Sequence, residues 1–278
     1  LSYFGDWIHN TQDLTLRYSK AEPFSYVVID NFLSQEYIEN LEQQFPTDFE
    51  NWHRYENPLE VKYANDNLEG MSKDIRQLFY ILSTDEVTGI FSKISGISDL
   101  EYDPYLHGAG LHSHPRHGRL NMHLDYEKHP NLKNKERRLN IILFLVKDWK
   151  EEWHGDNQLW DSEMKECKVR TYPKFNRAII FQTNEISWHG LPEPLQCPEG
   201  VFRKSLAYYY VSPLTHRDGD ANKFGNDGSG YRTKASFIKR PQDTEDERMN
   251  KLYKIRPHRR IEKEDMEKIW PDWTSGGE

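Results

Sequence analysis

The chain has 278 residues and a formal net charge of −8, which disfavours a general nucleic-acid-binding protein. Aromatic residues make up 13% of it, and this content argues against a disordered chain, although the mean hydropathy is −0.92. No apolar run reaches the roughly 18 residues that a membrane-spanning helix needs, and no charged-then-apolar leader is recognisable, so we expect no membrane association.

This length is sufficient for a sizeable core, and one compact domain with extensions is the simplest organisation. Cys167 and Cys197 are the only cysteines. One bridge between them is possible, but we expect two free thiols in an intracellular, cytoplasmic protein.

Residues 1–100 are expected to form an N-terminal strand and supporting helices. The expected elements are a strand over 26–30 and helices over 34–46, 71–82 and 84–96. Ser34 and Thr84 fit the N-cap positions of two of these helices. Their apolar stripes indicate a helical layer over residues 24–97 that packs its apolar face on a sheet.

From about residue 101 the hydrophobic period changes from that of helices to that of strands. The expected strands cover 111–114, 119–126, 138–146, 156–160, 167–172, 177–183 and 202–211. Seven short strands separated by turn residues favour a sandwich or barrel over residues 101–212. The expected fold class is therefore α+β and mainly β.

Residues 213–278 differ in composition. Asp218–Gly230 is rich in Gly, Asn and Asp, which is typical of a mobile loop. Residues 239–268 hold 10 Lys and Arg against 8 Asp and Glu, with the two signs interspersed. This pattern favours a solvated helical tail over a nucleic-acid-binding arm.

The candidate chemistry lies in the strand over residues 119–126. His123 and Asp125 project to the same side of it, together with Arg119 and Asn121, because side chains alternate with a period of 2. A His beside an Asp is often only a surface pair or a buried hydrogen bond. His189, 66 residues downstream, would complete two imidazoles and one carboxylate, the facial set of non-haem Fe(II) oxygenases.

The order of motifs over roughly residues 24–212 resembles the 2-oxoglutarate- and Fe(II)-dependent oxygenases, in their prolyl 4-hydroxylase-like branch. The matching segments are His123-Leu-Asp125, Arg138–Val146 with Lys147-Asp148-Trp149, Asn176–Phe181, Trp188-His189-Gly190 and Arg203-Lys-Ser205. The resemblance implies a double-stranded β-helix, or jelly roll, buttressed by the N-terminal helices and followed by the C-terminal helical tail.

The resemblance also implies the roles of individual residues. His123, Asp125 and His189 would hold Fe(II) and form the catalytic centre, with O2 and 2-oxoglutarate as cosubstrates and ascorbate as a support. Arg203 would bind the distal carboxylate of 2-oxoglutarate, because a guanidinium offers a two-point fork, and Ser205 shares its strand face. Asn121 is a further candidate for cosubstrate binding, and Asn121 and Trp160 are both expected at the pocket wall.

Two departures from the family's pattern stand near these residues. Phe144 occupies a position where some prolyl hydroxylases carry a tyrosine that helps to hold 2-oxoglutarate. Asp156 and Asn157 stand where relatives often have a pair of glycines.

Other functions stay open on the sequence. A jelly roll can be a non-catalytic binding module, lectin-like or metal-sensing, and a metal-dependent hydrolase would need a general base that no residue clearly supplies. His112 and His114 could share a structural zinc ion, but no cysteine is near in sequence, so loop histidines are the preferred interpretation. The substrate is expected to be a prolyl residue in a peptide or protein, or a small molecule that is an amino acid or contains a sugar. Nothing in the sequence indicates the oligomeric state.

Overall fold

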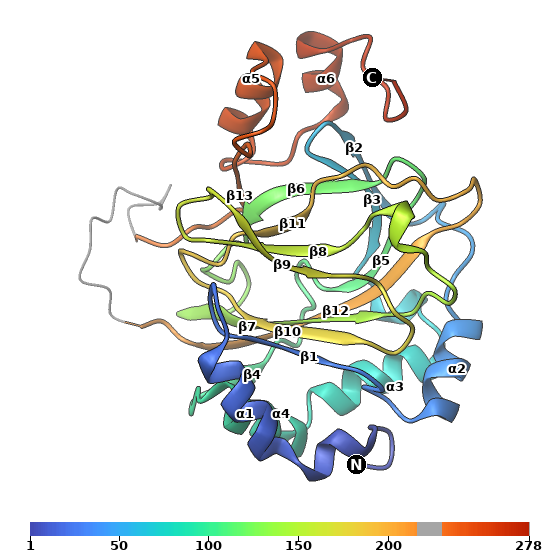
Figure 1. The fold of residues 1–278 in the computed structure, drawn as a ribbon, viewed down its shortest axis with the longest axis vertical. Coiled ribbons are helices and arrows are strands. Elements are labelled where there is room, and N and C mark those ends of the chain that lie inside the picture. Colours follow the sequence, from blue (N-terminus) through green and yellow to red (C-terminus); the bar gives the residue numbers. More distant parts are fainter. Residues whose placement is uncertain (216–229, 278) are drawn as a thin grey trace.

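The computed structural model describes residues 1–215 and 230–277. Figure 1 shows a curled β-sheet in the middle of the molecule, with α1–α4 at one end and α5 and α6 at the other. The strands are β1 (Tyr26–Ile29), β2 (His53–Asn57), β3 (Glu60–Asn65), β4 (Glu101–Tyr102), β5 (Gly110–His114), β6 (Arg119–Leu124), β7 (Lys135–Phe144), β8 (Asn157–Trp160), β9 (Cys167–Thr171), β10 (Ala178–Gln182), β11 (His189–Leu191), β12 (Arg203–Pro213) and β13 (Ser236–Phe237). The helices are α1 (Thr11–Lys20), α2 (Gln35–Gln43), α3 (Lys73–Leu82), α4 (Asp85–Ser95), α5 (Glu247–Ile255) and α6 (Lys263–Ile269), with short 3-10 helices at Asp6–His9, Leu68–Gly70 and Glu151–Trp153.

The strands form one antiparallel sheet in the order β1-β10-β7-β12-β5-β3-β6-β11-β8-β9, to which β2, β4 and β13 add at β3, β12 and β6. The sheet curls so that its inner face encloses a pocket, and its fold is the expected jelly roll. Alternation along β12 separates two environments: Leu206 and Tyr208 belong to the core shared with the helices, while Arg203 and Ser205 line the pocket.

The helical layer is confirmed for α2, α3 and α4, which begin within two residues of the expected positions. Thr84 accepts a hydrogen bond from the backbone N–H of Val87 and Ser72 does the same for Ile75, so both act as N-caps. Ser34 occupies the N-cap position of α2 without a capping hydrogen bond from its side chain. The buried stripes of these helices join β7, β10 and β12 in the main hydrophobic core.

The prediction that residues 24–97 form a helical layer that supports the sheet is wrong in one part. Residues 53–65 form the hairpin β2–β3, and β3 pairs with both β5 and β6 in the middle of the sheet. Glu60 and Lys62 face the pocket from this strand, and both are buried. These inward-facing charges hide the strand pattern, because a half-buried strand normally shows an apolar inner face.

The C-terminal segment is not simply a solvated tail. Leu252 of α5 is fully buried in a cluster with Leu59 and Phe237, and Arg256 is only 7% exposed. The Nε of Arg256 lies 2.6 Å from the Oε1 of Glu60, which ties the end of α5 to the hairpin β2–β3. The loop predicted over 218–230 lies, except for Gly230, outside the described residues.

Two smaller expectations concern the cysteines and the helices. Cys167 and Cys197 are both free thiols, as expected. No helix in the described part of the chain combines the length and the apolar character that crossing a membrane requires.

The buried Glu60–Arg256 pair leads to a test of how the C-terminal segment is attached. Replacing Arg256 with Ala leaves the carboxylate of Glu60 buried without its partner, which should lower the free energy of unfolding by about 3–5 kcal/mol. Urea denaturation followed by fluorescence measures this change. Lys251→Ala, on the exposed side of α5, is the matched control and should change stability by less than about 0.5 kcal/mol. An unchanged denaturation midpoint for Arg256→Ala would contradict the attachment.

Candidate metal and cosubstrate site

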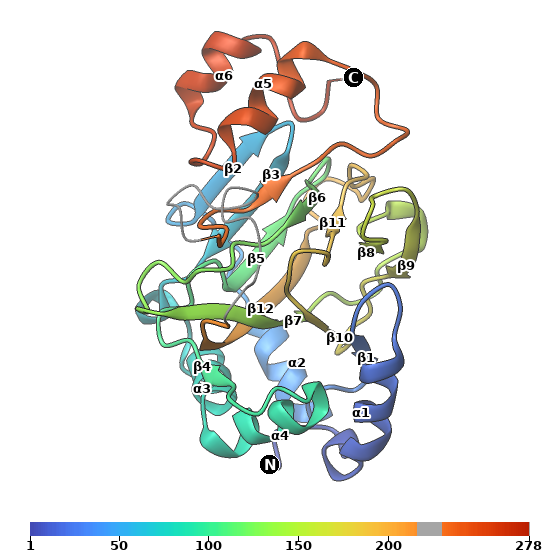
Figure 2. The same cartoon turned by 90° about the vertical axis from the view of Figure 1, so that its left-hand side faces the viewer.

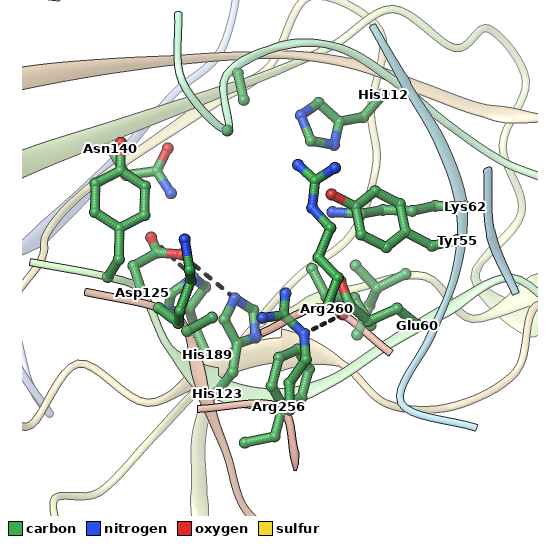
Figure 3. Close-up of a pocket in the computed structure, with 18 of the residues that line it drawn as sticks. Tyr55, Glu60, Lys62, His112, His123, Asp125, Asn140, His189, Arg256 and Arg260 are labelled. Carbon is green, nitrogen blue, oxygen red and sulfur yellow. Dashed lines mark hydrogen bonds and ion pairs between the residues drawn. The ribbon is translucent and has the colours of Figure 1, made fainter. Parts of the chain in front are cut away.

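Three side chains from two neighbouring strands meet inside the curled sheet. His123 of β6 is paired in register with His189 of β11, and Asp125 follows directly after β6. The Nε2 atoms of His123 and His189 lie 3.5 Å and 3.6 Å from the two carboxylate oxygens of Asp125. All three residues are buried, and one potential ligand atom from each lies within 4.8 Å of the others. Figure 3 shows them converging on one side of the pocket.

Hydrogen bonds to the backbone fix the tautomer of both imidazoles. The Nδ1 of His123 lies 2.9 Å from the carbonyl oxygen of Asn121, and the Nδ1 of His189 lies 2.8 Å from that of Ser187. A carbonyl can only accept, so each Nδ1 carries the proton and each Nε2 lone pair faces Asp125. This is the arrangement by which proteins orient metal-binding imidazoles. The donor set of the three side chains therefore fits a divalent transition metal.

Charges around the three ligands favour the protonation states that a metal needs. Burial raises the pKa of the Asp125 carboxyl, but the Arg137 guanidinium and the two imidazoles outweigh it and hold this pKa well below its usual range. Burial and the neighbouring His123 lower the pKa of His189 to about 4. At neutral pH the carboxylate is therefore ionised and His189 is neutral.

Arg137, which the sequence analysis did not single out, holds the carboxylate in place. Its Nη1 lies 3.2 Å from the Oδ2 of Asp125. Its guanidinium carbon lies 3.7 Å and 3.3 Å from the ring centroids of Tyr126 and Tyr209, between the two rings. Arg137 stands just ahead of the segment that matched the family pattern, and no sequence signal places it beside Asp125.

The cavity in front of the three ligands has a volume of about 450 Å³. His123, Asp125, His189, Arg203 and Ser205 all line it, so the structure brings together five of the six predicted site residues.

Asn121 and Trp160 do not line the cavity, unlike the sequence expectation. The pairing of β6 with β11 shifts between His123 and Leu120, a bulge that breaks the alternation and turns Leu120 into the cavity instead. The side chain of Asn121 lies near the hydroxyl group of Tyr253 in α5 instead. Trp160 packs with Met122 in a separate apolar cluster.

Arg203 is the second functional group of the cavity and is only 2% exposed. Its Nε donates to the carbonyl oxygen of Gly155 at 2.7 Å, while its Nη2 has no hydrogen-bond partner within the described residues. Burial lowers the pKa of Arg203 to about 10, so the guanidinium stays charged at neutral pH. Phe144 lies 4.9 Å below it, and the Nδ2 of Asn157 nearby is also unpartnered. A buried cation with a free donor needs an anionic ligand.

His112 and His114 lie on β5, which agrees with the strand expected over residues 111–114. His114 is directly opposite Arg203, and His112 is opposite Ser205, in the pairing of β5 with β12. Burial lowers the pKa of both well below the usual value, so they are neutral at physiological pH. His123, Asp125 and His189 are the one set of three or more potential metal ligands found in residues 1–215 and 230–277. His112 and His114 do not form another such set.

Comparison with known sequences shows that this chain is similar to a known protein family. The model of the 2OG-Fe(II) oxygenase superfamily matches residues 109–211. The chain is 26% identical over 207 residues to prolyl 3-hydroxylase OGFOD1 of Mus musculus, an alignment that covers 70% of this chain and 34% of the mouse protein. The chain therefore spans about a third of the length of that relative.

Solved structures show the same fold. A prolyl-4-hydroxylase of Pseudomonas putida superimposes with a TM-score of 0.52 at 14% identity, over 73% of this chain and 100% of that one. A prolyl hydroxylase from Trichoplax adhaerens, in complex with a peptide fragment of the hypoxia inducible factor oxygen degradation domain, gives 0.50 at 15% identity, over 76% and 95%.

The three ligands can be tested by metal binding alone. His123→Ala, Asp125→Ala and His189→Ala each remove one ligand, which should weaken the binding of Fe(II) or Ni(II) by more than the roughly 10- to 100-fold typical of losing a supporting residue. Anaerobic calorimetric titration measures the affinity, and circular dichroism reports the fold. His9→Ala, an exposed histidine outside the cavity, is the control. Wild-type affinity in any two of the three ligand variants would exclude this metal site.

Proposed function

We propose that this chain is a member of the 2OG-Fe(II) oxygenase superfamily and a hydroxylase that uses Fe(II), 2-oxoglutarate and O2 to hydroxylate an unactivated C–H bond. The observation that carries the proposal is the single cavity that holds both a buried His–Asp–His set and the free donor of a buried arginine. A purely binding module needs neither an open metal position nor a clamp for a second anion.

Each group in the cavity has a task in this reaction. When bound, Fe(II) supplies the oxidising chemistry that converts 2-oxoglutarate and O2 into succinate, carbon dioxide and a hydroxylated product. His123, Asp125 and His189 would hold the metal, and Arg137 keeps the Asp125 carboxylate ionised and oriented.

The opposite end of the cosubstrate site is built by β12. Arg203 would bind the distal carboxylate of 2-oxoglutarate through its free Nη2, and Ser205 can add a hydroxyl donor from the same strand face. The ring of Phe144 lies against the guanidinium where a tyrosine hydroxyl could otherwise have bonded the ligand. Binding of the distal carboxylate therefore depends more heavily on Arg203 than it would with a tyrosine at position 144.

We infer that the primary substrate is a prolyl residue in a peptide or protein. The names of the relatives support this substrate: one is a prolyl 3-hydroxylase, and the Trichoplax adhaerens enzyme was solved with a peptide. A metal-dependent hydrolase is less well supported, because it needs a general base beside the metal. Asp125 is paired with Arg137 and Glu60 with Arg256, and burial lowers the pKa of His112 and His114 well below the usual value, which makes them weak bases.

The proposed reaction is tested by following the cosubstrate. The purified chain, supplied with Fe(II), ascorbate, 2-oxoglutarate and O2, should form succinate, and Asp125→Ala should abolish this because the metal loses its one anionic ligand. Mass spectrometry measures both the consumption of 2-oxoglutarate and the formation of succinate. Zn(II) should not replace iron, since it has no redox chemistry. Turnover that zinc supports and iron does not would favour a hydrolase.

The clamp is tested by a titration with 2-oxoglutarate under anaerobic conditions with the metal bound. Arg203→Ala should cost about 2–5 kcal/mol, as when one side of a buried charge pair is removed, which is roughly 30- to 4,000-fold in affinity. Arg203→Lys should lose less, because it keeps the charge but not the fork. Ser205→Ala should cost on the order of 1 kcal/mol.

Lys204 offers the matched control for this titration. Its side chain lies on the other face of β12, 3.6 Å from Glu42, so Lys204→Ala should bind 2-oxoglutarate as the wild type does. Metal affinity should change little in all four variants. Wild-type affinity for 2-oxoglutarate in Arg203→Ala would refute the clamp.

A further inference from the structure

One side of the cavity is built by segments outside the part of the chain that matches the family model. The ring of Phe237 in β13 stacks on His123, with centroids 5.0 Å apart and planes at 19°. Arg256 and Arg260 reach the cavity from the end of α5 and the residues after it, and Tyr55 and Lys62 reach it from the hairpin β2–β3. Figure 2 shows α5 and α6 close to this hairpin. None of these groups is one of the three proposed metal ligands or one of the proposed clamp residues Arg203 and Ser205.

Strand register places four of the cavity's side chains in one row. Arg203 is opposite His114 in the pairing of β12 with β5, and Lys62 is opposite Tyr55 in the pairing of β3 with β2. The pairing of β3 with β5 puts Tyr63 opposite Ser113, so Lys62 continues this register toward His114. Directly opposite residues project to the same face of a sheet. The row therefore runs from Arg203 across the inner face to Tyr55, with Lys62 two strands away from Arg203.

Lys62 is a buried cation without an anionic partner of its own. It is 9% exposed, and no hydrogen bond or ion pair joins its ammonium group to any residue in 1–215 or 230–277. Its Nζ lies 5.1 Å from the ring centroid of Tyr55. The nearby carboxylate of Glu60 is already held by Arg256 at 2.6 Å. Lys62 lines the cavity, so a ligand that enters it can supply the counter-charge that a mostly buried ammonium group lacks.

Arg260 brings a second positive charge to the same ring. Its guanidinium carbon lies 5.4 Å from the centroid of Tyr55, and its side chain makes no hydrogen bond or ion pair with the described residues. In Figure 3, Lys62, Tyr55 and Arg260 gather on the side of the cavity away from Asp125 and His189. The third carboxylate of the cavity belongs to Glu262, the N-cap residue of α6. It brings one negative charge against the two positive charges of Lys62 and Arg260, so this side of the cavity keeps a net positive charge.

We propose that Lys62, Tyr55 and Arg260 form a second anion site that binds a carboxylate or phosphate group of the primary substrate, so that the enzyme prefers a peptide with an acidic or phosphorylated residue near the target residue. This inference rests on the proposed function for the chemistry at the metal. It adds a substrate class, an acidic peptide, that the metal and cosubstrate site does not specify.

The test measures the binding of four synthetic peptides to the Ni(II)- and 2-oxoglutarate-loaded protein by fluorescence anisotropy. All four share a central proline, flanked in turn by Asp, phosphoserine, Asn or Lys. The wild type should bind the Asp or the phosphoserine peptide at least about tenfold more tightly than the Asn peptide, and the stronger of these two shows which anion the site takes. Lys62→Met should reduce this preference to within about twofold, and the double variant Lys62→Glu, Arg260→Glu should prefer the Lys peptide. Lys254→Ala, on the exposed face of α5, is the matched control and should keep the wild-type preference.

Several outcomes would overturn the proposal. Equal affinity for the Asp, phosphoserine and Asn peptides, or no binding of either anionic peptide, excludes the anion site. A Lys62→Met protein that binds 2-oxoglutarate more weakly and keeps the peptide preference assigns Lys62 to the cosubstrate instead. Succinate formation by the wild type is measured in parallel. Succinate without a peptide preference refutes only this inference, whereas a preference without succinate refutes only the proposed function.

Discussion

The buried ion pair between Asp125 and Arg137 is the interaction on which the cavity depends. A carboxylate removed from water is stable only with a partner of opposite charge, and a buried guanidinium has the same requirement. The rings of Tyr126 and Tyr209 enclose Arg137, and its Nη2 donates to the carbonyl oxygen of His107 at 2.9 Å. The pair keeps one anionic ligand ionised between the two imidazoles, and the charge of a bound metal completes the balance.

The curled sheet explains how one cavity can hold a carboxylate and two cations apart from one another. The three proposed metal ligands come from β6, the residue after it and β11, the proposed clamp Arg203 from β12, and Lys62 from β3. Their side chains approach the cavity from different parts of its wall, because the inner face is continuous across these strands. In our proposals, the His–Asp–His set binds the metal, Arg203 binds the cosubstrate and Lys62 binds an acidic peptide.

Some features of the cavity follow from the sequence of a single strand or helix, whereas others depend on contacts between distant segments. The shared face of Arg203 and Ser205, and the closeness of His123 to Asp125, follow from the period of a single strand. The capping of α4 by Thr84 is local in the same way. Such features could be predicted from the sequence, and the resemblance to a family then linked His189 to them.

The sequence by itself therefore predicted α2 to α4, most of the strands that build the cavity and a sandwich or barrel, but not α1. Its resemblance to a family predicted the jelly roll and five of the six candidate site residues that the structure brings together. Only the tertiary structure decided that Asn121 faces away, because a bulge between β6 and β11 depends on how two distant strands pair. The same holds for Arg137 beside Asp125 and for the hairpin at Lys62. Their charged side chains read as solvent-exposed, and only the curled sheet and the C-terminal segment enclose them. Local periodicity encodes which way a side chain points from its own strand, whereas long-range packing decides what lies opposite.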